Sequence, residues 1–215
     1  MSPPAQKRAI KQERAARTRK EILDAAIRLF ARKGLLATTM AQLAKEIGMT
    51  PGALYWHFPT KEDLLLGAIE ELDGRYREAW RDLTTEGRKL PARDQMHAFF
   101  LRTNAFVRDN RHYGMFLGLL AAESPELSAR VAAALRDAMA VYVQVLTGII
   151  KHGQQRTFEF REDLDARTLA HALIAAHMGA VIHSNLFDPA LSYDEIIAAL
   201  EKVTAPGMER GVRPS

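Results

Sequence analysis

The stretch MTPGALYWHFPTKEDL, residues 49–64, decides how the N-terminal part of this chain folds. Pro51 suits the first position of a helix, because the N–H that it lacks has no intrahelical partner there. On such a helix Leu54 and Phe58 lie four positions apart and share the face that anchors the helix to a core. Trp56 lies about 200° around the helix from Leu54. It must therefore point outward, and an exposed aromatic face indicates a partner outside the chain.

The residues before this helix have the spacing of a helix-turn-helix. Ala44 is a small residue where two helices cross, Gly48 tolerates the positive φ of the turn, and Leu54 supplies the apolar anchor. Thr39 with Gln42 predicts a capping box that starts the first of the two helices. An earlier helix is expected over residues 18–33 and ends at Gly34, a plausible left-handed C-cap.

The remaining sequence has helical periodicity and no sustained strand-type alternation, which predicts an all-α fold of about nine helices. Capping residues mark the breaks: Thr60 with Asp63, Asn110, Ser124 before Pro125, Asp188-Pro189, and Ser192 with Glu195. The later helices are expected at about 60–83, 92–109, 112–122, 125–155, 164–187 and 193–204. We expect a flexible basic arm (1–16), a helix-turn-helix domain (17–61), a larger helical domain (62–204) and a loose tail (205–215).

Composition excludes several classes of protein. The 215 residues include no cysteine, which excludes disulfides, thiol nucleophiles and cysteine-ligated zinc. The sequence has no Gly-rich phosphate loop after a strand and no H-E-x-x-H or G-x-S-x-G motif, so we expect neither an enzyme nor a cofactor. The N-terminus lacks the apolar region of a secretory signal, and no run approaches the length of a membrane span. These features predict a cytoplasmic protein without a membrane partner.

Positive charge is concentrated at the N-terminal end. Residues 1–61 hold 12 Lys and Arg against 4 Asp and Glu, whereas the remaining residues hold 18 against 22. This asymmetry fits a basic module that faces a polyanion, joined to a mildly acidic body with another role. A solvated basic tail without a ligand is the alternative for residues 2–16.

Residues 17–70 resemble the N-terminal DNA-binding domain of the TetR family of bacterial transcriptional regulators. The markers are Ala25-Ala26, Phe30, Gly34, Thr38-Thr39, Leu43-Ala44, Ile47-Gly48, Leu54-Tyr55, Phe58, Lys61 and Leu64. The resemblance implies a homodimer that binds a palindromic DNA operator, most simply as a repressor that a small apolar effector releases. An architectural or division-control DNA-binding protein without an effector is the alternative.

The resemblance also assigns DNA-contacting residues, because the helix that begins at Pro51 would lie in the major groove. The expected contacts are Thr39, Thr50, Pro51, Gly52, Ala53, Tyr55, Trp56, His57 and Lys61. Three of them have alternative roles within the fold. Tyr55 could pack its ring on the first helix, His57 could cap its own helix, and Lys61 could be an ordinary solvated lysine.

The C-terminal body is expected to hold the effector and the dimer contact. Aromatic, methionine and a few polar residues of the central segment are candidate pocket residues: Phe99, Phe100, Arg102, Asn104, Phe106, His112, Tyr113, Phe116, Met139 and Tyr142. Small and apolar residues of the last two helices are candidates for a four-helix dimer interface: Ala172, Ala176, Ala180, Ile196 and Leu200. The alternative is that both helices pack only within their own subunit. His171, His177 and His183 point about 120° apart on one helix and predict no metal site.

Overall fold

The structure is a computed structural model that describes residues 3–81, 83, 89–187 and 192–209. Within these residues the protein is all-α, as predicted, with nine α-helices, one short 3-10 helix and an isolated β-bridge between Phe160 and Glu209. The elements are α1 (Pro3–Lys33), α2 (Met40–Glu46), α3 (Pro51–His57), α4 (Lys61–Ala79), α6 (Ala92–Asp109), α7 (Arg111–Ala122), η2 (Ser124–Glu126), α8 (Ala129–Gln155), α9 (Ala166–Phe187) and α10 (Tyr193–Met208).

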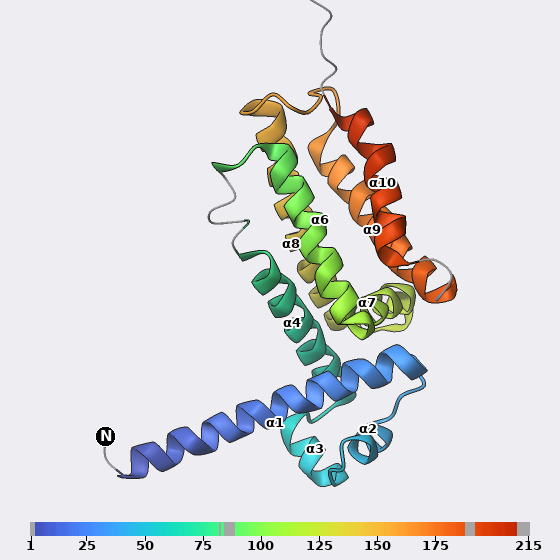
Figure 1. Cartoon of the computed structure of the whole chain (residues 1–215). Helices are drawn as coiled ribbons and strands as arrows, with labels where there is room; N and C mark the ends of the chain where they lie inside the picture. Colours follow the sequence, from blue (N-terminus) through green and yellow to red (C-terminus); the bar gives the residue numbers. More distant parts are fainter. Residues whose placement is uncertain (1–2, 82, 84–88, 188–191, 210–215) are drawn as a thin grey trace, which may run out of the picture.

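The chain forms a small base and a larger helical body (Figure 1). Helix α1 crosses the base, with α2 and α3 beneath it, and α4 leads from the base into the bundle of α6, α8, α9 and α10. Helix α7 lies where the two parts meet and packs on both α1 and α9. The helix-turn-helix is therefore joined to the body through two elements, α4 and α7.

Side-chain caps start the short helices as the sequence predicted. Thr39 and Gln42 form a reciprocal capping box at α2, and Ser192 forms one with Glu195 at α10. The hydroxyls of Thr50 and Thr60 accept the backbone N–H groups of Ala53 and Asp63 at the starts of α3 and α4. The two turns of the base use positive φ at Gly34 and Gly48, as expected, because a side chain there would be strained.

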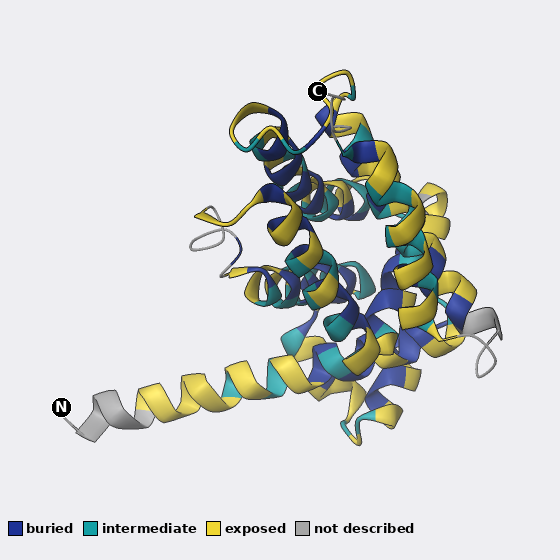
Figure 2. Cartoon of the chain, turned by 45° about the horizontal axis from the view of Figure 1, so that its top comes forward, coloured by how far each residue is buried: buried dark blue, intermediate teal, exposed yellow. Residues whose placement is uncertain are grey.

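Helix α1 is longer than predicted. It begins at Pro3, although the sequence pattern placed its start near residue 18 and a flexible arm before it. Residues 5–17 consist mostly of Ala, Arg, Lys, Gln and Glu, which are strong helix formers even without an apolar face. Periodicity missed this segment because it has no apolar stripe, and residues 8–14 are exposed where the helix projects from the base (Figure 2).

Other boundaries differ from expectation as well, and α4 ends at Ala79 rather than near residue 83. The Ser124-Pro125 pair starts the 3-10 helix η2, and α8 begins later, at Ala129, where the Ser128 hydroxyl accepts the Val131 N–H. Helix α10 continues to Met208 through Pro206, into the segment expected as a tail. Its end is held because the Arg161 N–H donates to the Met208 carbonyl at 3.0 Å. The predicted break at residues 188–189 lies outside the described residues.

Helix α8 is the central element of the body and packs on α4, α6 and α9. By length and composition it is the one described helix that could cross a membrane, which corrects the expectation that no segment approaches a span. That signal is weak, because a buried core helix has the same composition. Its apolar residues face the body, where Leu146 and Ile150 are fully buried.

Candidate functional site

Helix α3 presents an unusually bare outer face. Leu54 is fully buried, but Tyr55 is 49% exposed and Trp56 is 72% exposed. Thr50, Pro51, Gly52 and Ala53 at the start of the helix are exposed as well. The Tyr55 side chain is thus about half covered by the fold, and residues 50–53 share an open surface with Trp56.

His57, the last residue of α3, is half-buried. Its ring meets the Trp56 ring edge to face, with centroids 4.6 Å apart. Burial and then the nearby Arg19 guanidinium lower the pKa of His57 below its usual value. Arg19 lies over the Phe58 ring and donates to the His57 carbonyl at 3.5 Å. His57 is therefore a neutral hydrogen-bonding group beside a cation.

Lys61 makes contacts within the fold that the sequence did not indicate. Its ammonium donates to the carbonyls of Leu35 and Leu36, in the turn after α1. The Glu123 carboxylate, at the end of α7, accepts the N–H groups of the same two residues at 3.3 and 3.0 Å. Burial lowers the pKa of Lys61, and Glu123 partly opposes that shift. Lys61 and Glu123 thus clamp one turn from both sides, so the Lys61 ammonium is already engaged within the fold.

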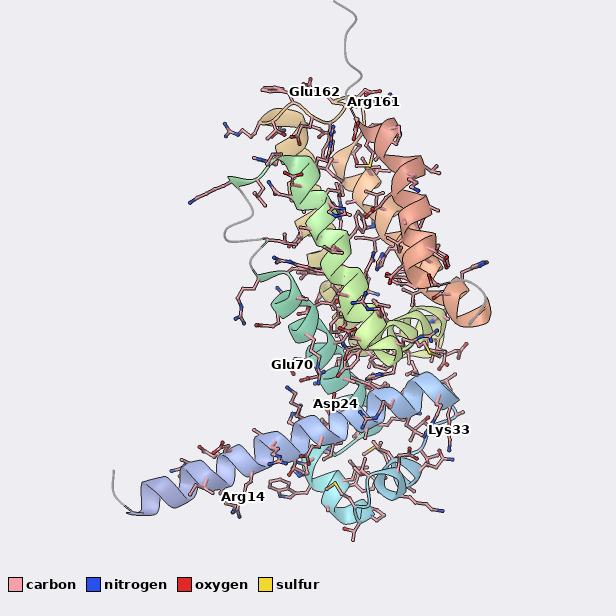
Figure 3. All side chains as sticks on the ribbon, viewed as in Figure 1. Arg14, Asp24, Lys33, Glu70, Arg161 and Glu162 are labelled. Carbon is pink, nitrogen blue, oxygen red and sulfur yellow. The ribbon has the colours of Figure 1, made fainter. Side chains whose placement is uncertain are left out.

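The two remaining parts of this surface are Thr39 and the arm of α1. Thr39 is exposed at the start of α2, although its hydroxyl is engaged in the capping box. Arg8, Lys11 and Arg14 are exposed along the part of α1 that projects beyond the base, where Figure 3 labels Arg14. The base therefore combines an exposed aromatic helix with a basic arm.

A cavity of about 40 Å³ lies in the body between α4, α6, α7, α8 and α9. Four predicted pocket residues line it: Phe99, Phe100, Met139 and Tyr142. The other lining residues were not predicted: Tyr76, Trp80, Thr103, Leu117, Ile174, His177 and Met178. Tyr76 and Trp80 lie four positions apart and so share a helix face, but this spacing does not indicate which space the face borders.

Six predicted pocket residues do not line this cavity. Tyr113 and Phe116 face the base instead, because α7 crosses above α1. The Tyr113 hydroxyl donates to the Asp24 carboxylate at 2.5 Å, and the Phe116 ring stacks on Phe30 at 5.8 Å. Asn104 accepts from the Tyr193 hydroxyl at 3.1 Å. The other three are half-buried on α6 and α7: Arg102, Phe106 and His112.

Polar groups around the cavity are nearly all paired. The Trp80 indole N–H donates to the Thr103 hydroxyl at 3.0 Å, and that hydroxyl donates to the Phe99 carbonyl at 2.7 Å. The Tyr193 hydroxyl lies 2.6 Å from Nε2 of His177, whose pKa burial lowers to about 4. The Tyr142 hydroxyl is different, because it is buried without a hydrogen-bond partner among the described residues. His177 is therefore uncharged at neutral pH, and one buried hydroxyl, that of Tyr142, is left unsatisfied.

The junction between base and body carries a charged cluster. The Asp24 oxygen that accepts from Tyr113 also accepts from Arg75 at 2.7 Å, and Arg75 pairs with Glu71 at 2.7 Å. Arg75 lies over the Tyr113 ring at 4.8 Å. Figure 3 shows Asp24 on the side of α1 that faces α4. This cluster ties three helices, α1, α4 and α7, at one point.

The outer face of α9 carries small exposed residues, but in a different register from the prediction. Ala172 is exposed as expected, Ala176 is half-buried, and Ala180 is 4% exposed because it packs within its own subunit. On α10, Ile196 and Leu200 are half-buried. The exposed residues of this face, which we call the α9–α10 face, are Ala172, Ala175, Gly179, Ile182, Ala199 and Val203. The three histidines of α9 separate as predicted, since His171 and His183 are exposed and His177 faces inward.

Two family models match the chain. The model described as bacterial regulatory proteins, tetR family, matches residues 22–68. The model described as the tetracyclin repressor-like C-terminal domain matches residues 92–200, about half of the chain. Together they cover both the helix-turn-helix and the helical body.

Curated relatives are most similar over the base. The HTH-type transcriptional regulator AcrR of Shigella flexneri is 51% identical over 57 residues, which is 26% of either chain. The HTH-type transcriptional repressor KstR2 of Rhodococcus jostii is 42% identical over 80 residues, which is 35% of this chain and 37% of KstR2. The match thus spans well under half the length of these relatives. The fatty acid metabolism regulator protein of Bacillus subtilis is 26% identical over 72% of this chain and 76% of its own.

Solved structures share the whole fold. A TetR-family regulator from Agrobacterium tumefaciens has a TM-score of 0.78 at 19% identity, covering 91% of this chain and all of that one. A transcriptional regulator from Saccharomonospora viridis, solved with choline, has a TM-score of 0.71 at 25% identity, covering 91% and 99%. AibR, solved with isovaleryl coenzyme A and operator DNA, has a TM-score of 0.69 at 18% identity, covering 86% and 96%. With both family models matched in order and the fold shared throughout, this chain belongs to the tetR family of bacterial regulatory proteins.

Proposed function

We propose that the protein is a cytoplasmic transcriptional repressor that binds a palindromic DNA operator as a homodimer and leaves it when a small apolar effector binds the body. The observation that carries the proposal is the outer face of α3, where Trp56 is 72% exposed without serving the core. In this proposal α3 enters the major groove, with Thr50 to Ala53 nearest the bases and Tyr55 and His57 on the backbone. The basic arm of α1 adds attraction to phosphates that is independent of sequence.

The proposed dimer uses the α9–α10 face. Small side chains allow helices to approach closely, and a two-fold axis through this face would give a four-helix interface. An ideal Cβ at Gly179 meets nothing within 4 Å in its own chain, so only a second copy would feel a larger side chain there. Such a dimer presents two α3 helices to half-sites about 34 to 36 Å apart.

Release by an effector would act through α7. Leu117 of this helix lines the cavity, while Tyr113 binds Asp24 of α1 and Glu123 holds the turn after α1. An effector that fits the cavity only when α7 moves would favour a conformation in which the base is displaced. Its binding free energy is then coupled to that of DNA, and the coupling acts equally in both directions.

The test is selection of random duplex DNA by the purified protein, followed by sequencing of the bound pool. We expect an enriched palindrome, and Trp56→Ala should lose it while Leu90→Ala, at an exposed site far from the base, keeps it. A pool without enrichment refutes operator binding and favours the architectural alternative. Release is tested by fluorescence anisotropy of the selected duplex during a screen of small molecules. A duplex that stays bound throughout refutes the ligand-released repressor.

The dimer is tested separately by light scattering. Gly179→Leu should give a monomer that keeps its helical circular dichroism, because Gly179 is exposed and an added Cβ meets nothing within 4 Å in its own subunit. Gly148→Leu is the matched control, since Gly148 of α8 also has nothing within 4 Å but lies off the α9–α10 face. An unchanged dimer mass for Gly179→Leu removes α9 from the interface.

A further inference from the structure

The turn after α1 binds a carboxylate through its backbone. Gly34, with a φ of 86°, turns the chain where α1 ends, beneath α7 (Figure 1). The N–H groups of the next two residues, Leu35 and Leu36, then donate to the Glu123 carboxylate at 3.3 and 3.0 Å. Successive N–H groups that converge on one point form a nest, which is an anion-binding shape of the backbone. The turn is therefore built as an anion site, and a side chain from the end of α7 occupies it.

Two further features fit the turn to a carboxylate. An ideal Cβ at Gly34 would lie 3.3 Å from Oε1 of Glu123, so the absent side chain leaves room for the anion. On the opposite side, the Lys61 ammonium donates to the Leu35 carbonyl. This carbonyl and the Leu36 N–H belong to one peptide group, so a cation and an anion bind the two ends of the same dipole. Hydrogen bonds in such a chain polarise and strengthen one another.

The helix-turn-helix begins and ends at this turn. The chain runs from the turn directly to Thr39, which caps α2, and Lys61 is the first residue of α4, after α3. The Leu35 side chain anchors the turn in the core of the base, where it is fully buried. Any movement of the turn therefore moves the start of α2 relative to α1.

Glu123 is the short polar link between this corner of the body and the turn. The other link that α8 makes nearby is weaker, because Arg130 lies 3.7 Å from Glu62 and 3.6 Å from Asp63, and its side chain is 68% exposed. Exposed ion pairs of this kind contribute little to stability. Tyr113 holds the opposite end of α7. The position of the end of α7 on the base thus depends on the carboxylate of Glu123.

We propose that the turn at residues 34–36 is a carboxylate receptor, and that its occupation by the Glu123 side chain holds the helix-turn-helix in the conformation that binds DNA. The inference rests on the proposed operator binding and names the contact through which the body controls it. When the carboxylate leaves, both N–H groups lose their partner and α2 is no longer held. The DNA-binding conformation then becomes a minor one, and the operator affinity falls by its fraction.

The test restores the anion from solution. Glu123→Ala removes Cγ and the carboxyl group, and acetate consists of the same two carbons and two oxygens. Tm is measured without DNA at neutral pH, in acetate and in chloride of equal ionic strength. In chloride we expect Glu123→Ala to melt about 4–8 °C below the wild type, and acetate to restore most of that loss. If the variant does not fold in chloride, recovery of helical circular dichroism in acetate is the same readout.

Glu126→Ala is the matched control, because Glu126 is an exposed glutamate three residues further along the chain. Neither this variant nor the wild type should melt differently in acetate and chloride. Equal gains in all three proteins would be a general effect of the salt and would overturn the receptor. So would a Glu123→Ala variant that acetate does not stabilise.

Two more substitutions test the shape of the site. Glu123→Gln fills the same space without the charge, so acetate should not recover its lost stability. Glu123→Gly removes one carbon more than Glu123→Ala, so propionate should stabilise it better than acetate does. If the glycine and alanine variants respond alike to the two acids, the anion does not take the place of the Glu123 side chain and the receptor is overturned.

DNA binding is then measured by fluorescence anisotropy of the selected duplex, at a temperature where circular dichroism shows each variant folded. In chloride Glu123→Ala should bind roughly tenfold more weakly than the wild type, as expected if about a tenth of the molecules keep the competent conformation. Acetate at the same ionic strength should restore the affinity of this variant and leave that of the wild type unchanged. Operator binding by Glu123→Ala as tight as that of the wild type overturns the role of the receptor in DNA binding.

The two measurements separate this inference from the repressor proposal. The melting experiment needs no DNA, so it decides the receptor even if the wild type selects no palindrome. In that case operator binding fails, and the role of the receptor in it is overturned as well. If the wild type binds its operator and acetate restores neither Tm nor affinity, the repressor stands and the receptor is overturned.

Discussion

Replacing Gly153 with alanine should destabilise the protein, although alanine is the better helix former. Gly153 lies in α8, and an ideal Cβ there would contact Cδ2 of Phe160 and lie 2.6 Å from Cε2 and 2.8 Å from Cγ. Phe160 is 4% exposed, and its N–H and that of Glu159 both donate to the Gly153 carbonyl, at 3.2 and 2.9 Å. The ring cannot withdraw without breaking this turn, because the contact includes Cγ, the ring atom nearest the backbone.

The opposing terms can be weighed. Alanine in place of glycine stabilises a helix interior by about 1 kcal/mol. If the Phe160 ring stays in place, overpacking costs about 1–3 kcal/mol. If the ring moves into solvent, the protein loses the about 1.5–3 kcal/mol that its burial contributes. The steric terms win, and we expect the free energy of unfolding to fall by about 2 kcal/mol. For a chain of this size that lowers Tm by about 4–8 °C.

Gly148→Ala in the same helix is the matched control. An ideal Cβ at this exposed position meets nothing within 4 Å, so only the helix propensity changes, and we expect a gain of about 0.5–1 kcal/mol. Urea unfolding followed by circular dichroism measures both variants against the wild type. Opposite signs are expected. If Gly153→Ala is as stable as Gly148→Ala, the packing of Phe160 on α8 is not as described.

Three further changes test the site. Lys61→Met should lower the free energy of unfolding by about 1 kcal/mol and leave the salt dependence of DNA binding unchanged. If the slope of log K against log salt instead falls in magnitude by about 0.9, Lys61 contacts a phosphate after all. Tyr113→Phe removes the hydrogen bond to Asp24, so the free energy of unfolding measured in urea should fall by about 1–2 kcal/mol and ligand-induced DNA release should weaken. Unaltered release would show that this hydrogen bond does not couple the ligand to DNA. Stability should fall as pH drops from about 6.5 towards 4, by up to about 3 kcal/mol, because the unfolded chain protonates His177 in this range and the folded chain does not. A His177→Gln variant with the same pH profile would contradict that assignment.

Hydrogen bonds between near neighbours explain why most helix starts could be predicted. A threonine or serine that caps a helix uses groups only three residues away, so the sequence of Thr39, Thr50, Thr60 and Ser192 contains the whole interaction. The bare face of α3 was predictable for a similar reason. The angle between Leu54 and Trp56 follows from helix geometry alone.

The contacts that the sequence did not indicate are those whose partner is distant in sequence. Aromatic residues of α6 and α7 were all candidates for the pocket, but Tyr113 and Phe116 face the base because α7 crosses α1, a relation that no local pattern contains. Lys61 has the position of a phosphate contact, yet the turn at Leu35 lies within its reach. Side-chain type indicated an aromatic interior, and only the packing of the helices decides which space each ring borders.

In the proposed mechanism, α7 connects ligand binding with DNA binding, because it packs on α9, borders the cavity in the body and contacts the base. On one side Gly114 approaches α9 so closely that an ideal Cβ would lie 2.9 Å from Cγ1 of Val181, and Leu117 borders the cavity in the body. On the other side Tyr113 and Glu123 bind the base. A helix this tightly seated cannot bend away locally, since packed interiors transmit strain. In the proposed release mechanism, a ligand that widens the cavity in the body displaces α7 as a unit, and the contacts of α7 with the base carry that displacement to the helix-turn-helix.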